Sequence, residues 1–145
     1  MTSKALKNKI RLAFVAEYFA GGFYLEIAKS FADRPDIAQR LRKTAGDEIR
    51  HGGYFNQLHA AEFGKSMPMR EQLMQAGKVV GMVNNLIPDW LLKKQKRLDF
   101  ITKGEAAAVR ALEKELKANK TNAYLQLVEK ILPDERQHAD RYHVA

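Results

Sequence analysis

The sequence has no cysteine, only four prolines and nine glycines in 145 residues, and no long uninterrupted apolar run. Without cysteine there can be no disulfide framework, no thiolate metal site and no cysteine nucleophile. An iron–sulfur cluster or a rubredoxin-type electron carrier within this chain is excluded as well. The apolar stretch from Leu12 to Leu25 contains Glu17, so it suits neither an export signal nor a membrane span. We therefore expect a cytoplasmic protein.

The composition is that of a folded domain, with 46% hydrophobic and 29% charged residues. At this length the chain can bury one core, and we expect a single domain over residues 1–145. The net charge of +8 is uneven, because residues 65–104 hold eight basic and three acidic groups whereas residues 105–145 hold seven of each. No basic motif with interleaved aromatic residues accompanies the charge, so we expect no nucleic-acid partner.

Helical periodicity runs through the whole chain, and no alternation typical of strands has useful length. Proline, glycine and capping residues separate five predicted helices, which cover residues 3–31, 35–64, 69–87, 89–119 and 121–143. Ser3 and either Thr121 or Asn122 are the predicted N-caps of the first and last helices. The fold class predicted is all-α: an antiparallel four-helix bundle with a long crossover that carries a short extra helix.

The four long helices each carry one apolar stripe with alternating spacings of three and four residues. In the 89–119 helix this stripe includes Leu91, Leu98, Ala108 and Leu112. Each stripe is interrupted near its middle by carboxylate or imidazole side chains. The interrupting residues are Glu17, Glu48, His51, Glu105, Glu135 and His138.

Four carboxylates buried without compensation would strongly destabilise a core, and two divalent cations would neutralise them. Residue spacing supports this explanation, because Glu17 and Glu48 each lie about 20 Å from the first helix–helix turn at ~1.5 Å per residue. Glu105 and Glu135 repeat the same spacing in the second pair of helices. Each helix pair therefore places one Glu opposite a Glu-x-x-His motif, whose members share one face of the helix.

This pattern resembles the ferritin-like di-iron carboxylate superfamily, in the order Glu17, Glu48-Ile49-Arg50-His51, Glu105 and Glu135-Arg136-Gln137-His138. The resemblance implies a ferritin-like bundle in which these six residues bind two iron ions, with Glu48 and Glu135 as bridges. This ligand type would also accept Mn/Fe or Mn/Mn pairs.

Within the superfamily the chain resembles rubrerythrins in its helix spacing, although the extra Glu that rubrerythrins carry on the third helix is replaced by Ala108. It also resembles demethoxyubiquinone hydroxylases in its long middle gap. Asp47 to His51 resembles the Asp-Glu-x-Arg-His string of other di-iron oxygenases. Four side chains are candidates for supporting the metal ligands from behind: Asp47, Asp134, Tyr24 and Tyr142.

The resemblance implies an oxidoreductase that activates O₂ or peroxide to oxidise a small or lipid-like substrate, with electrons from a separate reductase. The alternative is ferroxidation for iron handling. The segment 69–97 combines apolar and basic residues, so we weigh a peripheral membrane contact against simple coverage of the bundle. A homodimer is also left open.

Some features allow two explanations. The pairs Gly21-Gly22 and Gly52-Gly53 indicate either a cavity for O₂ or substrate, or a close approach of helices. Pro133 lies inside the last predicted helix and should bend it. His59 and His143 lie outside the predicted cluster and are expected to be solvated.

Overall fold

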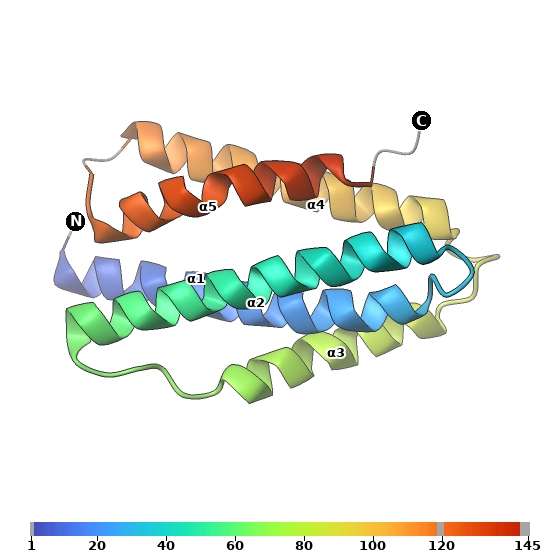
Figure 1. Ribbon diagram of the computed structural model, residues 1–145, viewed down its shortest axis with the longest axis horizontal. Coiled ribbons are helices and arrows are strands. Elements are labelled where there is room, and N and C mark those ends of the chain that lie inside the picture. Colours follow the sequence, from blue (N-terminus) through green and yellow to red (C-terminus); the bar gives the residue numbers. More distant parts are fainter. Residues whose placement is uncertain (1, 119–120, 143–145) are drawn as a thin grey trace. The chain divides into compact units, whose positions relative to one another are not determined.

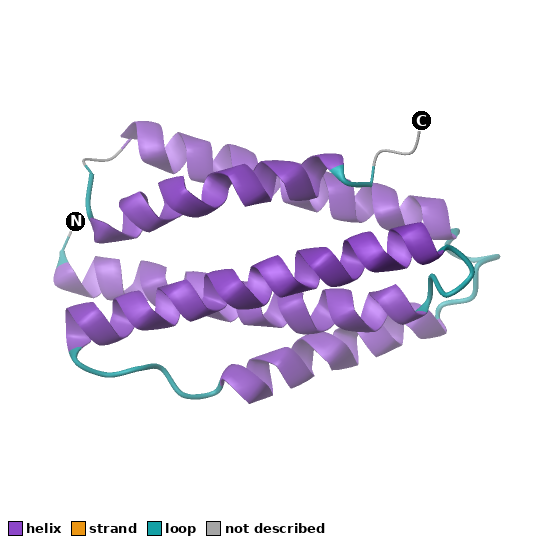
Figure 2. Ribbon diagram, in the orientation of Figure 1, coloured by secondary structure: helices purple, strands orange, loops and turns teal. Residues whose placement is uncertain are grey.

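The computed structural model describes residues 2–118 and 121–142, which form five helices and no strand (Figure 1, Figure 2). The helices are α1 (Ser3–Lys29), α2 (Pro35–Phe63), α3 (Arg70–Leu86), α4 (Lys94–Ala118) and α5 (Ala123–Asp140). The predicted all-α, ferritin-like fold class is confirmed, including the short extra helix between the two long pairs. The last three residues, His143 among them, lie outside the described residues.

The helices group into two compact units, the first ending at Leu86 and the second beginning at Ile87. The first contains α1, α2 and α3, and the second contains α4 and α5. The single domain expected over residues 1–145 stays a prediction.

In the first unit α1 and α2 form an antiparallel hairpin. Gly21 of α1 lies at Ala45 and Ile49 of α2, and Gly52 of α2 lies at Tyr18 of α1. Pro35 is at the start of α2, where its missing N–H costs nothing, and Gly64 ends the helix in the left-handed conformation with φ of 76°. The first N-cap is Thr2 rather than the predicted Ser3, since the Thr2 hydroxyl accepts from the Ala5 N–H at 3.2 Å.

Helix α3 packs on α1 and runs parallel to it. Gly22 of α1 meets the backbone at Met74, while Gly77 and Gly81 of α3 lie against the backbone and side chains between Phe19 and Glu26. A Cβ on Gly81 would stand 2.7 Å from Cβ of Glu26, closer than real Cβ atoms come. The glycines on the two helices therefore allow a close approach of backbones, and the Asn85 amide completes it by donating to the Glu26 carbonyl at 2.8 Å.

In the second unit α4 and α5 form an antiparallel hairpin. Asn122, one of the two predicted candidates, is the N-cap of α5, with its Oδ1 accepting from the Leu125 N–H at 2.9 Å. Nε and Nη2 of Arg136 both donate to one carboxylate oxygen of Glu113, at 3.2 and 2.9 Å. These contacts fix the level of α5 on α4, which positions the side chains described below.

The sequence prediction was wrong in part of α4. The helix begins at Lys94 instead of residue 89, because residues 88–93 form a turn in which the Pro88 carbonyl accepts from the N–H groups of Leu91 and Leu92. Leu91 is consequently 66% exposed instead of buried. Farther along, Val109 is buried and Ala108 is exposed, so the inward stripe steps by four residues after Glu105.

His59 was also predicted wrongly. It is 1% exposed, and its Nδ1 lies 2.7 Å from the carbonyl oxygen of Lys65 in the loop after α2. The ring also packs on Phe63 with centroids 5.1 Å apart. His59 therefore belongs to the packing of the α2 end and not to the solvated surface.

Candidate metal centre

The first unit brings three of the predicted ligands together. Glu17 projects from α1, and Glu48 and His51 project from one face of α2. One ligand atom from each of the three lies within 4.8 Å of the others. His51 is fully buried, Glu48 is 4% exposed and Glu17 is intermediate. This unit therefore contains a buried group of two carboxylates and one imidazole.

The second unit contains the same chemical set. Glu105 projects from α4, and Glu135 and His138 project from one face of α5. Their ligand atoms again lie within 4.8 Å of one another, and all three side chains are buried. Each unit thus supplies one isolated Glu and one Glu-x-x-His motif from two antiparallel helices.

Each group has one imidazole nitrogen near a carboxylate, which lies on the other helix in the first group and on the same helix in the second. Nδ1 of His51 lies 3.7 Å from Oε2 of Glu17, and Nδ1 of His138 lies 3.7 Å from Oε2 of Glu135. This separation is too long for a hydrogen bond. The side chains have other polar contacts, but these two Nδ1 atoms are buried and make no hydrogen bond within the described chain. A ligand pair of this kind, a neutral imidazole beside a carboxylate, fits a bound divalent cation.

The donor set also limits the metal. Oxygen and nitrogen ligands without sulfur suit Fe, Mn or Zn, whereas Ca²⁺ and Mg²⁺ prefer all-oxygen sites. Two carboxylates in each unit offset the charge of one divalent ion. The residues present therefore fit a carboxylate-rich site for first-row transition metals.

Of the supporting residues predicted, Asp47 has a described partner. It is 7% exposed, and Nη1 of Arg50 lies 3.2 Å from its Oδ1, one turn along α2. Asp134 is intermediate in exposure, and Tyr24 and Tyr142 are buried at 6% and 1% exposed. The proposed roles of these four residues behind the ligands stay predictions.

Two further tyrosines lie beside the first group. The ring of Tyr54 stacks on His51 with centroids 6.4 Å apart and planes at 28°. Tyr18, next to Glu17 in the chain, is 2% exposed and packs against Gly52. The spacing of Tyr54, three residues after His51, was the signal in the sequence for the first contact. The contact of Tyr18 with Gly52 depends instead on how α1 packs on α2.

The glycines near the ligands serve packing. A Cβ on Gly21 would stand 2.6 Å from Cγ1 of Ile49, and one on Gly52 would stand 2.8 Å from the Tyr18 ring. These positions are already filled by neighbouring side chains. Of the two explanations left open by the sequence, close helix approach is the one that holds for Gly21, Gly22 and Gly52.

A comparison with protein-family models matches the rubrerythrin model over residues 8–145, which is nearly the whole chain. No curated protein and no solved structure shows a significant match. The family match agrees with the all-α fold and with the two carboxylate–histidine groups. The chain therefore belongs to the rubrerythrin family, within the ferritin-like di-iron superfamily.

Proposed function

We propose that the chain holds two iron ions and uses them in oxidation–reduction chemistry. The six ligands would be Glu17, Glu48, His51, Glu105, Glu135 and His138, with Glu48 and Glu135 as the bridging carboxylates. The observation that carries the proposal is the pair of matching buried groups, one in each unit, each with two carboxylates and one imidazole. Family membership and the matched sequence spacing support joining them into one dinuclear site.

Bound iron would supply the activation of O₂ or peroxide for oxidation of a small or lipid-like substrate. The chain's own residues would neutralise the metal ions, orient the ligands and exclude bulk water. The carboxylates neutralise the cations, and burial of both histidines keeps bulk water from the ligands. Because Nδ1 faces a ligand carboxylate in each unit, Nε2 is the ring nitrogen left to donate to a supporting acceptor. Asp47 and Asp134 are the acceptors we propose, which would fix the histidine tautomers.

We expect a separate electron donor, since this chain has no cysteine for an iron–sulfur or rubredoxin-type centre. Rubrerythrins with an additional glutamate on the third helix have one more carboxylate than this chain, where that position is the exposed Ala108. We therefore favour an oxidase or oxygenase over a peroxidase. Ferroxidation is the second candidate, and iron stoichiometry separates the two.

The decisive experiment adds Fe(II) anaerobically to protein freed of metal and follows the thermal midpoint and the bound iron per chain. We expect saturation at about two ions, as in di-iron carboxylate bundles, with a gain in thermal stability. After exposure to air, iron content that stays at this level supports the oxidase. Continued uptake of many ions per chain supports iron storage and contradicts it.

The matched variants are Glu48→Gln with His51→Ala for the ligands and Glu129→Gln for the control. Glu129 is an exposed carboxylate on α5 outside both groups. The ligand variant should bind iron weakly and gain no stability from it, while the control should behave as the parent protein does. Equal gains in all three proteins would overturn the proposal.

A further inference from the structure

Helix α4 carries a straight stripe of exposed residues on the side opposite its buried residues Leu98, Glu105 and Val109. The members of this stripe recur at alternating spacings of four and three residues, which keeps them on one face of the helix. They are Lys96, Phe100, Lys103, Ala107, Arg110, Lys114 and Lys117, and all seven are exposed. Most of the stripe is therefore made of basic side chains.

The positive charge of the stripe is not neutralised within the helix. None of its lysines or its arginine has an ion pair or hydrogen bond within the described residues. The acidic residues of α4 other than Glu105 have other partners. These pairs are Asp99 with Gln95, Glu113 with Arg136, and Glu115 with Tyr124. Asp140 of α5 lines a hollow together with Arg110, so five cations face one further acid.

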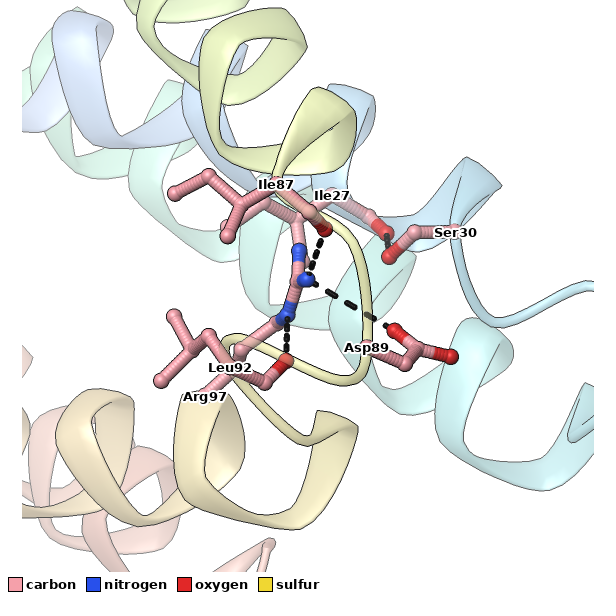
Figure 3. A network of polar contacts seen from close by, with 6 residues as sticks. All are labelled: Ile27, Ser30, Ile87, Asp89, Leu92 and Arg97. Carbon is pink, nitrogen blue, oxygen red and sulfur yellow. Dashed lines mark hydrogen bonds and ion pairs between the residues drawn. The ribbon is translucent and has the colours of Figure 1, made fainter.

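Two other cations of α4 do have a place in the fold. Lys94 has an interaction of its own. Arg97 is only 4% exposed and holds the turn before the helix (Figure 3). Its Nε donates to the Leu92 carbonyl at 3.1 Å, and its Nη2 donates to the Ile87 carbonyl and lies 3.6 Å from Oδ1 of Asp89. No such contact within the described chain holds the exposed cations, so folding of this unit does not account for them.

The middle of the stripe lies behind a ligand of the proposed metal centre. Glu105 is 8% exposed on the buried side of α4, whereas Ala107 is on the opposite side. A helix with its side chains is about 10–12 Å across, so roughly one helix would separate Glu105 from a partner bound on the stripe. Residues at this level are small, and a Cβ added to the exposed Gly104 would have nothing within 4 Å. A partner can therefore approach closely between the longer cations on either side.

We propose that this stripe is the docking surface for an acidic protein that donates electrons, one at a time, to the proposed metal centre. The inference rests on the proposed function, which needs a separate electron donor. Each docked donor would lose one electron and reduce one ferric ion to ferrous, so two donations would reduce a pair of ions. Opposite charge on the donor would speed its association and orient it. Phe100, which is 65% exposed, would add an aromatic contact of the kind enriched in protein interfaces.

Other occupants fit this surface less well. A second copy of the chain would bring another net charge of +8, and a two-fold contact would set the stripe against itself. A helix that lies on a membrane presents a broad apolar face, whereas the one large apolar residue in the stripe is Phe100. An acidic protein surface is therefore the partner that the charge of the stripe favours.

Docking can be measured without metal. The metal-free, full-length protein is titrated at low salt with an oxidised, acidic plant-type ferredoxin, and binding is followed by isothermal titration calorimetry. Basic cytochrome c, another small one-electron carrier, is the control partner. We expect the ferredoxin to bind and cytochrome c not to bind. Raising the salt to about 0.5 M should weaken ferredoxin binding, because the Debye length falls well below 10 Å.

Variants of the stripe test its residues. Lys103→Gln combined with Arg110→Gln and Lys114→Gln should weaken ferredoxin binding about tenfold, mainly through a slower association rate. Phe100→Ser should also weaken binding but should leave its salt dependence unchanged, because it removes no charge. The thermal midpoint of each variant shows that it is folded.

A matched control variant makes the same change in net charge elsewhere. It combines Lys4→Gln, Arg42→Gln and Lys43→Gln, at exposed positions of α1 and α2. Like the stripe variant, it replaces two lysines and one arginine. If the contact is local, the control should bind ferredoxin within about twofold of the parent protein.

Electron transfer is measured separately on the iron-loaded, oxidised proteins. Reduced ferredoxin is mixed with each of them, and its oxidation is followed by absorbance. The second-order rate should fall about tenfold in the stripe variant, in parallel with its slower association, and should be unchanged in the control.

Four results would overturn the proposal. The parent protein could fail to bind ferredoxin at low salt, or the control variant could lose as much binding as the stripe variant. Ferredoxin could bind at the stripe and reduce the iron-loaded stripe variant as fast as the parent. Anionic vesicles or duplex DNA could bind more tightly than ferredoxin and lose that binding in the stripe variant, which would assign the surface to one of those polyanions. A chain that binds ferredoxin at the stripe but takes up no iron would instead contradict the proposed function.

Discussion

Nδ1 of His51 lies 3.7 Å from Oε2 of Glu17, in the interior and beyond hydrogen-bond reach. The same separation recurs between His138 and Glu135 in the second unit. Burying carboxylates beside an imidazole that does not bond to them is unfavourable unless a cation is bound. The metal-free protein should therefore be less stable than its apolar packing alone would allow.

Replacing a ligand carboxylate should have opposite effects on the two states of the protein. Glu48→Gln removes a buried charge, so the free energy of unfolding without metal should rise by about 1 kcal/mol or more. The same variant should lose the gain that metal gives, which is about 2.7 kcal/mol at a hundredfold excess of ligand over its Kd. Thermal unfolding with and without Fe(II) or Mn(II) measures both effects. A variant destabilised in both states would show that Glu48 is an ordinary structural residue.

Pairing the two histidine variants tests whether the groups act as one site. In a shared dinuclear centre, His51→Ala and His138→Ala should each abolish most of the metal-induced stabilisation. The double variant should then lose little more, which is the non-additivity expected of residues that act as a unit. Isothermal titration and metal analysis of the four proteins provide the measurement. Additive losses, with one ion retained in each single variant, would indicate two independent mononuclear sites.

Some glycines of the first unit lie where a Cβ would clash with a neighbouring atom, and others have open space at that position. Gly77→Ala would press a Cβ into the backbone of α1 at Phe19 and Phe23 and should cost about 1–3 kcal/mol. Gly46→Ala, with nothing within 4 Å of the new Cβ, should instead stabilise α2 by up to about 1 kcal/mol. Urea denaturation of both variants decides this. Equal effects would mean that α3 can separate from α1 at little cost.

The sequence predicted the buried carboxylate and imidazole groups because these residues interrupt an otherwise regular apolar pattern. Glu17, Glu48 and Glu135 stand out from stripes that are otherwise apolar, and hydrophobic burial determines those stripes. The packing role of Gly22 could not be predicted in the same way. A glycine looks the same in the sequence whether it lines a cavity or packs against the backbone of another helix. Only the position of Met74, fifty-two residues later, distinguishes them.

The start of α4 was missed for a related reason. The periodicity of residues 89–93 continues into the helix, but the side chain of Arg97 engages the carbonyl groups of Ile87 and Leu92 and stabilises a turn instead. A buried arginine is rare, and a sequence pattern places it on the solvated face. His59 was misplaced likewise, since its partner is the loop carbonyl of Lys65.

We therefore expect Arg97 to contribute more to the free energy of unfolding than its ion pair with Asp89 alone would. Arg97→Lys removes the forked geometry that reaches two carbonyl groups and should cost about 2–3 kcal/mol, as for a buried hydrogen-bonded charge. Asp89→Asn should cost less than about 1 kcal/mol, because its carboxylate is 62% exposed and 3.6 Å away. Thermal unfolding of the two variants gives the comparison. Similar losses would show that the carboxylate, and not the carbonyl groups, holds the arginine.

Pro133 provides the last test, because helix α5 continues through it from Ala123 to Asp140. Its nitrogen cannot donate to the carbonyl of Glu129, and its ring crowds that carbonyl, so the helix is weakened two residues before Glu135. Pro133 is exposed, and Pro133→Ala removes little packing. We expect the metal-free variant to gain about 1–3 kcal/mol in stability, in line with the helix propensities of the two residues.

If Pro133 adjusts the direction of Glu135 and His138, iron should bind more weakly to the Pro133→Ala variant. Gln126→Ala, on the exposed face of α5, serves as a control that changes helix propensity and leaves Pro133 in place. Thermal unfolding of the metal-free proteins and an Fe(II) titration separate the two effects. A more stable variant with unchanged iron affinity would show that the proline shapes the helix alone and does not position the ligands.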